Sequence, residues 1–373
     1  MANINDYLLW RGDLPINRKY KFNEIDSMIL ARFSYLLFDK IDIKPRETIA
    51  TISERMKDFD NKEFMYNGDK ELITNLGKSN RFKNLVVTDY IKLNNKETEN
   101  QFSAITIHIS NREMYISFMG TDMTIYGWKE DFNMAFMENV PCQILGKKYL
   151  EDISKKYHNK KIRIGGHSKG GNVAVYSAIT SSEKVKKRIV KVYNYDGPGF
   201  NKNIIDKYET DDILEKIETY IPQDSIIGRL LNHKEKKTII QSIEKGILQH
   251  DIYSWQVLKD DSIKLEKNTN ISEHIDKTVT DWLEKTTIEQ RKIFIDMAFE
   301  LFYSTEADTF GEIYNNLSEN IPKILRSYGK MPAEDKSIMT KMLKLMVASY
   351  MNIIRENVIF SNRKENIKTI RKI

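Results

Sequence analysis

The sequence predicts an α/β protein whose central sheet is mostly parallel and flanked by helices. Through the middle of the chain, short runs rich in β-branched and aromatic residues alternate with helix-like segments, as in parallel sheets. From about Leu265 onward the strand pattern stops and helical stripes replace it, one of them formed by Phe294, Met297, Ala298, Leu301 and Phe302. We therefore expect a main domain over residues 1–264 and a C-terminal helical region over 265–373 that packs on it or covers it.

The expected elements follow in chain order. Apolar residues recur at helical spacing between Asn23 and Phe38, and shorter N-terminal helices are predicted near residues 46–58 and 70–78. The period then changes, which indicates an antiparallel opening to the sheet. Strands are predicted at 85–93, 102–109, 114–118, 161–165, 189–195, 216–221 and 238–242, with helices at 143–157 and 171–179 between them.

Composition limits the classes of function. Hydrophobic residues make up 40% of the 373 residues and charged residues 30%, as in soluble globular proteins. The net charge of +6 comes from 59 basic and 53 acidic residues that are interspersed, so nucleic-acid binding is not expected. A single cysteine, Cys142, excludes an internal disulfide and a cysteine-rich zinc site, and it favours a reducing cytoplasm. No secretory signal or bilayer-spanning run is visible, so any membrane contact is expected to be peripheral.

The most informative motif is Gly166-His167-Ser168-Lys169-Gly170, which lies between an expected strand and an expected helix. A sharp strand-to-helix turn strains the backbone at the serine and lifts its hydroxyl clear of the sheet. Gly166 and Gly170 remove side chains that would collide there. The backbone amide of Lys169 stays free at the helix N-terminus, where it can stabilise an oxyanion. Ser168 is therefore the expected nucleophile; the alternative is a glycine-rich turn whose serine caps the helix.

A serine nucleophile needs a base and an acid that orients the base. Two aspartates directly follow expected strands beyond the elbow, Asp196 and Asp224. The common position of the acid, two strands after the elbow strand, favours Asp224. The alternative is Asp196, which otherwise forms a turn in Asp196-Gly197-Pro198-Gly199.

For the base, the usual order of serine, acid and histidine leaves the three histidines that follow Ser168. His250 lies in the loop after the strand predicted at 238–242, which is where the base belongs, and it is the favoured residue. His233 lies in a run of charged residues typical of a solvated loop. His274 falls in an apparent amphipathic helix, where a surface or packed histidine is the simpler interpretation.

A second oxyanion donor is expected in the loop Ser117-Phe118-Met119-Gly120-Thr121-Asp122, which follows an apolar strand. The amide of Thr121 is the favoured donor, with help from its hydroxyl, and Gly120 lets a ligand approach. The alternative is an ordinary strand-ending turn in which Thr121 or Asp122 caps the next helix. Such a site requires no metal and no organic cofactor.

These landmarks together resemble the class 3 (fungal-type) lipases. The resemblance covers roughly residues 85 to 255 and implies an α/β-hydrolase fold with Ser168, Asp224 and His250 as triad and the amides of Thr121 and Lys169 as oxyanion hole. Most of the chain is similar to an uncharacterised family of bacterial lipase-like proteins. That similarity rests on Trp10-Arg11-Gly12-Asp13, Gly127-Trp128-Lys129-Glu130-Asp131-Phe132 and Gln249-His250-Asp251.

The chain departs from the lipase pattern at two positions. Met119 replaces the usual arginine and so removes a buried polar anchor behind the oxyanion hole. Lys169 replaces the usual leucine, and its long cationic side chain is expected at the mouth of the site, in solvent or near an anionic head group.

The expected function is therefore hydrolysis of a carboxylic ester through an acyl-enzyme on Ser168. The expected partner is a small-molecule ester or lipid, a class that rests on the resemblance alone. Two alternatives remain open. One is a different acyl hydrolase, such as a thioesterase or a peptidase, and the other is a non-catalytic hydrolase fold that serves as a binding or scaffold protein.

Overall fold

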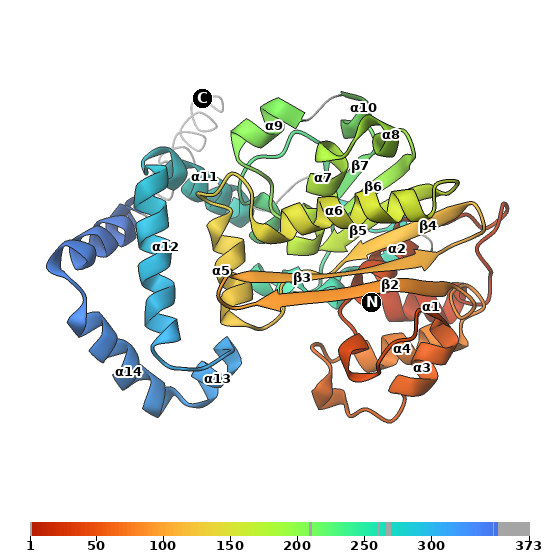
Figure 1. The fold of residues 1–373 in the computed structure, drawn as a ribbon, viewed down its shortest axis with the longest axis horizontal. Helices are drawn as coiled ribbons and strands as arrows, with labels where there is room; N and C mark the ends of the chain where they lie inside the picture. Colours follow the sequence, from red (N-terminus) through yellow and green to blue (C-terminus); the bar gives the residue numbers. More distant parts are fainter. Residues whose placement is uncertain (1, 209–210, 260, 266–269, 346, 350–373) are drawn as a thin grey trace, which may run out of the picture. The chain divides into compact units, whose positions relative to one another are not determined.

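The computed structural model (Figure 1) describes residues 2–208, 211–259, 261–265, 270–345 and 347–349. The chain divides into two compact units. The sheet unit comprises residues Met1–Asp122 and Tyr126–Lys267, and the helical unit comprises Met123–Ile125 and Asn268–Ile373. The helical unit therefore takes up a short segment from the middle of the sheet unit's sequence.

The described part of the sheet unit is built on one nine-stranded sheet in the order β1-β2-β3-β4-β5-β6-β7-β8-β11. Strands β4 to β8 pair in parallel, whereas β1, β2 and β3 on one side and β11 on the other add antiparallel pairs. The predicted α/β class and its antiparallel opening are confirmed. The strands are β1 (Arg46–Thr48), β2 (Val86–Asn95), β3 (Asn100–His108), β4 (Glu113–Phe118), β5 (Lys161–His167), β6 (Ile189–Tyr195), β7 (Ile217–Pro222), β8 (Lys237–Ile240) and β11 (Lys264–Leu265). Strands β9 (Val257–Leu258) and β10 (Asp261–Ser262) form a separate hairpin.

The N-terminal helices share one apolar core with one face of the sheet. They are α1 (Ile4–Arg11), α2 (Glu24–Phe33), α3 (Ile49–Met56) and α4 (Asp69–Lys78). Polar contacts fasten α2 to this face, because the hydroxyl of Ser117 donates to the carbonyl of Leu30 at 2.9 Å and that of Tyr195 to the carbonyl of Glu24 at 2.6 Å. These bonds hold α2 against the strands that lead to the elbow.

A second core fills the opposite face. Helices α6 (Pro141–Lys156) and α7 (Lys169–Thr180) are its largest helical contributors, and inward residues of β4, β5 and β6 pack against them. Helix α7 is buried along its whole length, which explains the small and apolar residues of its sequence. The remaining helices of this unit are α5 (Ile125–Asn133), α8 (Glu183–Lys186), α9 (Lys202–Tyr208) and α10 (Asp211–Leu214), with α5 beginning at the last residue of the inserted segment.

Two N-terminal boundaries differ from the sequence prediction. The helix expected over 46–58 begins later than predicted. Thr48 caps α3, because its hydroxyl oxygen accepts a hydrogen bond from the amide of Thr51 at 3.2 Å. Glu47 pairs with Val87 in the sheet instead of joining the helix. The helix expected to reach Phe38 ends at Phe33. There the backbone tightens into i to i−3 bonds, the first from the amide of Tyr35 to the carbonyl of Arg32 at 3.0 Å.

The helical unit contains α11 (Asn270–Glu284), α12 (Ile288–Tyr303), α13 (Phe310–Asn315), α14 (Leu317–Lys330) and a further helix over 333–345. Of the predicted stripe, Met297 is buried and the other four residues are partly buried. The inserted segment pairs within this unit, since the amide of Ile125 donates to the carbonyl of Asp308 at 2.9 Å and Thr124 forms an antiparallel bridge with Thr309.

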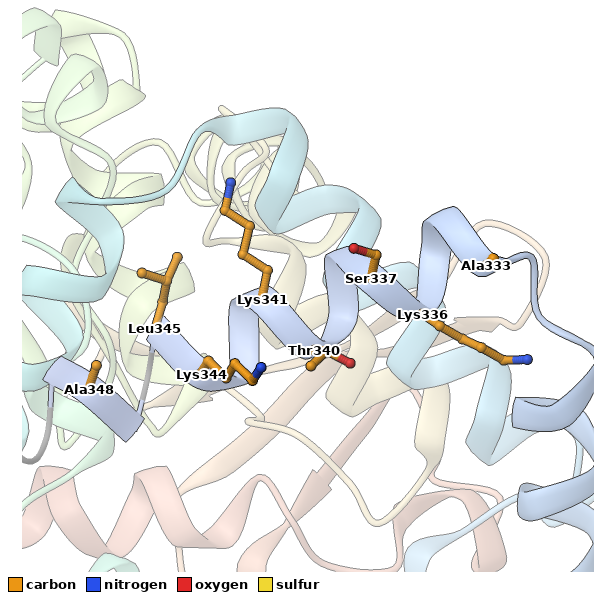
Figure 2. Close-up of a pocket in the computed structure, with 8 residues that line it drawn as sticks. All are labelled: Ala333, Lys336, Ser337, Thr340, Lys341, Lys344, Leu345 and Ala348. Carbon is orange, nitrogen blue, oxygen red and sulfur yellow. The ribbon is translucent and has the colours of Figure 1, made fainter.

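A groove of about 600 Å³ runs along the helix over 333–345. In Figure 2 the ammonium groups of Lys336 and Lys341 point apart, so these lysines do not gather around one point. Its lining residues are Ala333, Lys336, Ser337, Thr340, Lys341, Lys344, Leu345 and Ala348. Among the described residues, no helix combines the length and apolar character needed to cross a bilayer.

Candidate active site

Ser168 lies on a strained turn between β5, which ends at His167, and α7, which begins at Lys169. Its φ of 58° and ψ of −133° fall in a region that residues with a side chain rarely adopt. The amide of Ser168 donates to the carbonyl of Tyr195 at 2.9 Å, which ties the turn to the end of β6. The residue is partly exposed. This strand-turn-helix geometry is that of a nucleophile elbow.

The two elbow glycines allow three backbone segments to approach one another. A Cβ atom on Gly166 would lie 2.4 Å from the carbonyl carbon of Gly170, and a Cβ atom on Gly170 would lie 2.2 Å from the carbonyl oxygen of Phe118. Both contacts are with backbone atoms, which cannot swing away as a flexible side chain can. Any other residue at either position would push α7 away from β4 and β5, and Ser168 would move with it.

His250 and Asp196 meet at the same end of the sheet. Nδ1 of His250 lies 2.6 Å from Oδ2 of Asp196. Asp196 follows the last residue of β6, and it is buried with a φ of 54°. Its other oxygen, Oδ1, accepts hydrogen bonds from the amide of Gly228 at 3.1 Å and from the hydroxyl of Ser225. A carboxylate held in this way directs the Nδ1 proton of His250 toward itself, which leaves Nε2 as the acceptor.

Asp224, the acid favoured by the sequence, holds a different residue of the same loop. Its Oδ2 accepts a hydrogen bond from Nε2 of Gln249 at 2.6 Å, and its amide donates to Oε1 of Gln249 at 2.9 Å. Asp224 therefore anchors the residue before His250. The preference for Asp224 came from counting strands, whereas the geometry favours Asp196, which lies one strand closer to the elbow.

The other two candidate bases are His233 and His274. The side chain of His233 is buried and its Nδ1 lies 2.8 Å from Oε1 of Glu235, so it is not the solvated side chain that its charged surroundings suggested. The side chain of His274 lies outside the described residues. Of His233 and His250, whose side chains the structure describes, His250 is the one that contacts an aspartate after a central strand.

His167, beside Ser168, supports the backbone of His250. Its Nε2 lies 2.7 Å from the carbonyl oxygen of His250, and the two rings are 4.4 Å apart. The hydroxyl of Tyr35 donates to the carbonyl of His167 at 3.0 Å. Burial, reinforced by the charge of the neighbouring His250, holds the pKa of His167 well below its usual value. A neutral His167 can thus donate from Nε2 and fix the loop that carries His250.

The two expected oxyanion donors follow neighbouring parallel strands in matching positions. Phe118 of β4 pairs with Gly166 of β5, and Thr121 and Lys169 each come three residues later. The Lys169 amide is the first of α7, where no intrahelical acceptor is available. At Gly120 a Cβ atom would lie 2.0 Å from the hydroxyl oxygen of Tyr35 and 2.5 Å from the carbonyl oxygen of His167. The loop before Thr121 is therefore packed closely against the elbow.

The Lys169 side chain lies in a different place from the one expected. It is 1% exposed, and its Nζ lies 2.9 Å from Oε2 of Glu130 and 3.6 Å from Oδ1 of Asp131. The mouth position was wrong because these two carboxylates of α5 draw the ammonium inward. Sequence reasoning did not assign them a role, although adjacent acids in Gly127-Trp128-Lys129-Glu130-Asp131-Phe132 were a visible signal.

The elbow serine, the histidine–aspartate pair and the parallel strands that carry them define a lipase-like α/β-hydrolase fold. A model of the Mbeg1-like family matches residues 76–300, which is more than half of the chain. The chain belongs to this family.

Solved structures of lipases resemble the chain at low identity. A fungal lipase is 15% identical over 66% of this chain and 87% of its own, with a TM-score of 0.41. The lipase of Rhizopus microsporus var. chinensis is 12% identical over 66% and 79%, with a TM-score of 0.38. A fungal lipase–inhibitor complex is 13% identical over 58% and 77%, also with a TM-score of 0.38. No curated protein matches the chain.

Proposed function

We propose that the protein is a serine hydrolase that cleaves a carboxylic ester, with a lipid or another acyl ester as substrate. The observation that carries this proposal is the 2.6 Å contact between Nδ1 of His250 and Oδ2 of Asp196. It lies at the carboxyl end of the parallel strands, where Ser168 occupies a strained turn. A nucleophile after β5, a buried acid after the neighbouring strand β6 and a base in the segment after β8 supply the three groups that acyl transfer requires.

In the proposed reaction, Nε2 of His250 takes the proton of Ser168 Oγ as this oxygen attacks the ester carbonyl. Asp196 orients the ring and stabilises the imidazolium that forms. The oxyanion accepts hydrogen bonds from the amides of Thr121 and Lys169. The tetrahedral intermediate collapses, and the alcohol leaves with the proton from His250. Water then attacks the acyl-enzyme with His250 again as base, which releases the carboxylic acid and frees Ser168.

A fluorophosphonate probe tests this proposal, because it phosphonylates an activated serine without depending on the natural substrate. Wild-type protein should be labelled, and Ser168→Ala should not. Ser182→Ala is a suitable control, because Ser182 is an exposed serine shortly after the end of α7, and it should be labelled at the wild-type rate. Unlabelled wild-type protein, or a labelled Ser168→Ala variant, would sink the proposal and favour a binding or scaffold role.

Substrate class is tested separately from the nucleophile. Nitrophenyl esters of increasing acyl length should be cleaved with a preference for longer chains if the substrate is a lipid. Matched thioesters and peptides should be slower than oxygen esters. Faster turnover of the thioester or the peptide, with Ser168 labelled normally, would mean that the protein is another kind of acyl hydrolase with the same catalytic residues.

A further inference from the structure

A buried polar network joins the two residues that carry the proposed oxyanion amides. From α7, the ammonium of Lys169 reaches Glu130 at 2.9 Å and Asp131 at 3.6 Å in α5. The hydroxyl of Thr121 donates to Oδ2 of Asp131. The side chain of one donor residue is thus connected, through Asp131, to the side chain of the other.

Within this network Glu130 is saturated with donors. Its Oε1 accepts the amide of Cys142 at 2.8 Å, and its Oε2 accepts the amide of Gln101 at 3.1 Å as well as the ammonium of Lys169. Glu130 is fully buried. These donors hold the carboxylate in place, so Glu130 fixes the position of the Lys169 ammonium.

Asp131 is the member of this network whose carboxyl can change its protonation state near neutral pH. Burial raises the pKa of its carboxyl to about 6, against the opposing effects of the Lys169 ammonium and the Thr121 hydroxyl. Oδ1 of Asp131 accepts no hydrogen bond from the described residues. The ammonium of Lys169, 3.6 Å away, is the cation that offsets its negative charge. Burial disfavours the charge of Lys169 too, but Glu130 and Asp131 outweigh it and raise the pKa of Lys169 above its usual value. Lys169 is therefore a permanent cation beside a carboxyl that titrates.

We propose that the side chain of Lys169 is a positioning group for the oxyanion hole: it keeps Asp131 ionised as the acceptor for the Thr121 hydroxyl, and so fixes the Thr121 amide relative to the amide of Lys169 itself. This inference rests on the proposed function. One residue would then supply an oxyanion donor through its backbone and orient the second donor through its side chain. A leucine at this position could do the first but not the second.

The sign of the pH effect follows from the charges that face Asp131. Lys169 lowers the pKa of Asp131, whereas Glu130 raises it, and the hydroxyl of Tyr35 and the thiol of Cys142 are the other titratable groups nearby. Removal of the ammonium therefore raises the pKa of Asp131 further above about 6. The carboxyl would then be protonated at neutral pH and would no longer hold the Thr121 hydroxyl as an anion. Activity should be lost at a higher pH than in the wild type.

The first test measures the rate of fluorophosphonate labelling of Ser168 from pH 5 to 9. For Lys169→Met we expect labelling about 10-fold slower at pH 7, since one oxyanion donor is worth roughly 100-fold or more and here it is loosened rather than lost. The deficit should shrink toward pH 9, and the acid limb should shift to higher pH. Lys148→Met, at an exposed lysine of α6, is the matched control and should match the wild type.

A double-mutant cycle separates positioning from general packing. Thr121→Val removes the hydroxyl and keeps the amide, so it should slow labelling by a similar factor. If Lys169 acts through this hydroxyl, the double variant should be no slower than the slower single variant. Multiplied effects would mean that the two side chains act independently, which would overturn the inference.

Asp131→Asn provides a measurement that does not depend on folding of the Lys169 variant. It keeps the shape of the side chain but is neutral at every pH, so labelling should be slower above about pH 6 and should approach the wild-type rate toward pH 5, where the wild-type carboxyl is itself protonated. Unchanged labelling of folded Lys169→Met or of Asp131→Asn, with wild-type Ser168 labelled normally, would overturn this inference alone. Absence of Ser168 labelling in the wild type would overturn the proposed function and this inference with it.

Discussion

Two aspartates contact adjacent residues of one loop, and they differ in which of the two side chains they hold. Asp196 contacts the ring of His250, whereas Asp224 exchanges two hydrogen bonds with the side chain of Gln249. The indole of Trp255 donates to the carbonyl of Gln249 at 2.7 Å and adds a further contact to the same loop. Asp196 thus contacts the proposed base, His250, directly, whereas Asp224 contacts the residue before it.

Replacement of each aspartate by asparagine should have unequal effects. In Asp196→Asn the acceptor for the Nδ1 proton loses its charge and His250 can adopt the wrong tautomer, so labelling of Ser168 should fall by about 10³- to 10⁴-fold at pH 7. In Asp224→Asn an amide oxygen still accepts from Gln249, so the loss should stay below about 10-fold. Labelling rates of the two purified variants check this.

The opposite ranking, with Asp224→Asn more damaging than Asp196→Asn while both variants remain folded, would restore Asp224 as the acid. A melting curve for each variant supplies the control, because loss of the loop anchor would lower stability as well as activity.

At the scale of single residues, sequence was most informative where the signal was local. Ser168 and its glycines were predicted from five consecutive residues, and His250 from its place after a strand. The choice between Asp196 and Asp224 depends on how a loop 54 residues from Asp196 folds back on it. The burial of Lys169 depends on Glu130, 39 residues earlier. Neither partner is visible in a local pattern.

At the scale of elements, α2 is fastened by a buried ion pair at its first turn. Nε and Nη2 of Arg81 contact the two carboxylate oxygens of Asp26 at 2.6 and 2.5 Å. The hydroxyl of Tyr7 in α1 donates to the same carboxylate at 2.9 Å, and so does the amide of Asn23. Asp26 therefore joins α1, the start of α2 and the segment after α4.

Arg81→Met should lower the free energy of unfolding by about 3 to 5 kcal/mol, because it leaves the carboxylate of Asp26 buried without its cation. Urea denaturation gives this value. The double variant Asp26→Asn/Arg81→Met removes both charges and should recover part of the loss. Equal stability of the single and double variants would show that the uncompensated charge is not the cause.

The end of β3 carries a histidine that resists protonation. Nδ1 of His108 lies 2.9 Å from Nζ of Lys160, and its Nε2 lies 3.0 Å from the hydroxyl oxygen of Thr88. Burial first, and then the charge of Lys160, lower the pKa of His108 to about 4. The unfolded chain has an ordinary histidine pKa near 6.5 and so binds more protons than the folded protein between pH 4 and 6.5.

His108 should therefore contribute stability that is fully present above about pH 6.5 and declines as the pH falls toward 4. His108→Gln, which cannot titrate, should flatten the dependence of the unfolding free energy on pH in this window. Denaturation at pH 7.5 and pH 5 measures the difference for wild type and variant. A slope that the substitution leaves unchanged would refute the assignment to His108.

Element positions were predicted better than element boundaries. The strands before and after the elbow were predicted from β-branched and aromatic runs, which depend on neighbouring residues. The helix expected over 46–58 failed at its start, because Glu47 joins the sheet through Val87 and Thr48 caps the shorter helix. A strand of three residues leaves too short a pattern to separate from the helix that follows it.

At the scale of the whole molecule, the α/β class and the helical C-terminal region followed from the change of period along the chain. What no periodicity indicated is that Met123–Ile125 belongs to the helical unit. Its partners, Asp308 and Thr309, lie more than 180 residues later in the sequence, and three residues are too few to show a pattern.

Ile125→Pro tests the role of this short pairing. Proline is tolerated at the first position of a helix, and Ile125 is the first residue of α5, but the substitution removes the amide that donates to Asp308. Hydrogen exchange should become faster by about 10-fold in α13, which begins directly after the pairing. Ile125→Val keeps the amide and serves as control. Equal exchange in the two variants would contradict this role.

The helical unit is formed from two separate segments of the chain, and this limits how the unit can be gained or lost in evolution. Residues 268–373 form one continuous segment, so a single insertion or deletion could add or remove them. Such an event would leave Met123–Ile125 without the backbone it pairs with, two residues after Thr121. We therefore expect homologous genes to retain or lack the two segments together, with deletions of residues 268–373 accompanied by altered sequence between Thr121 and α5.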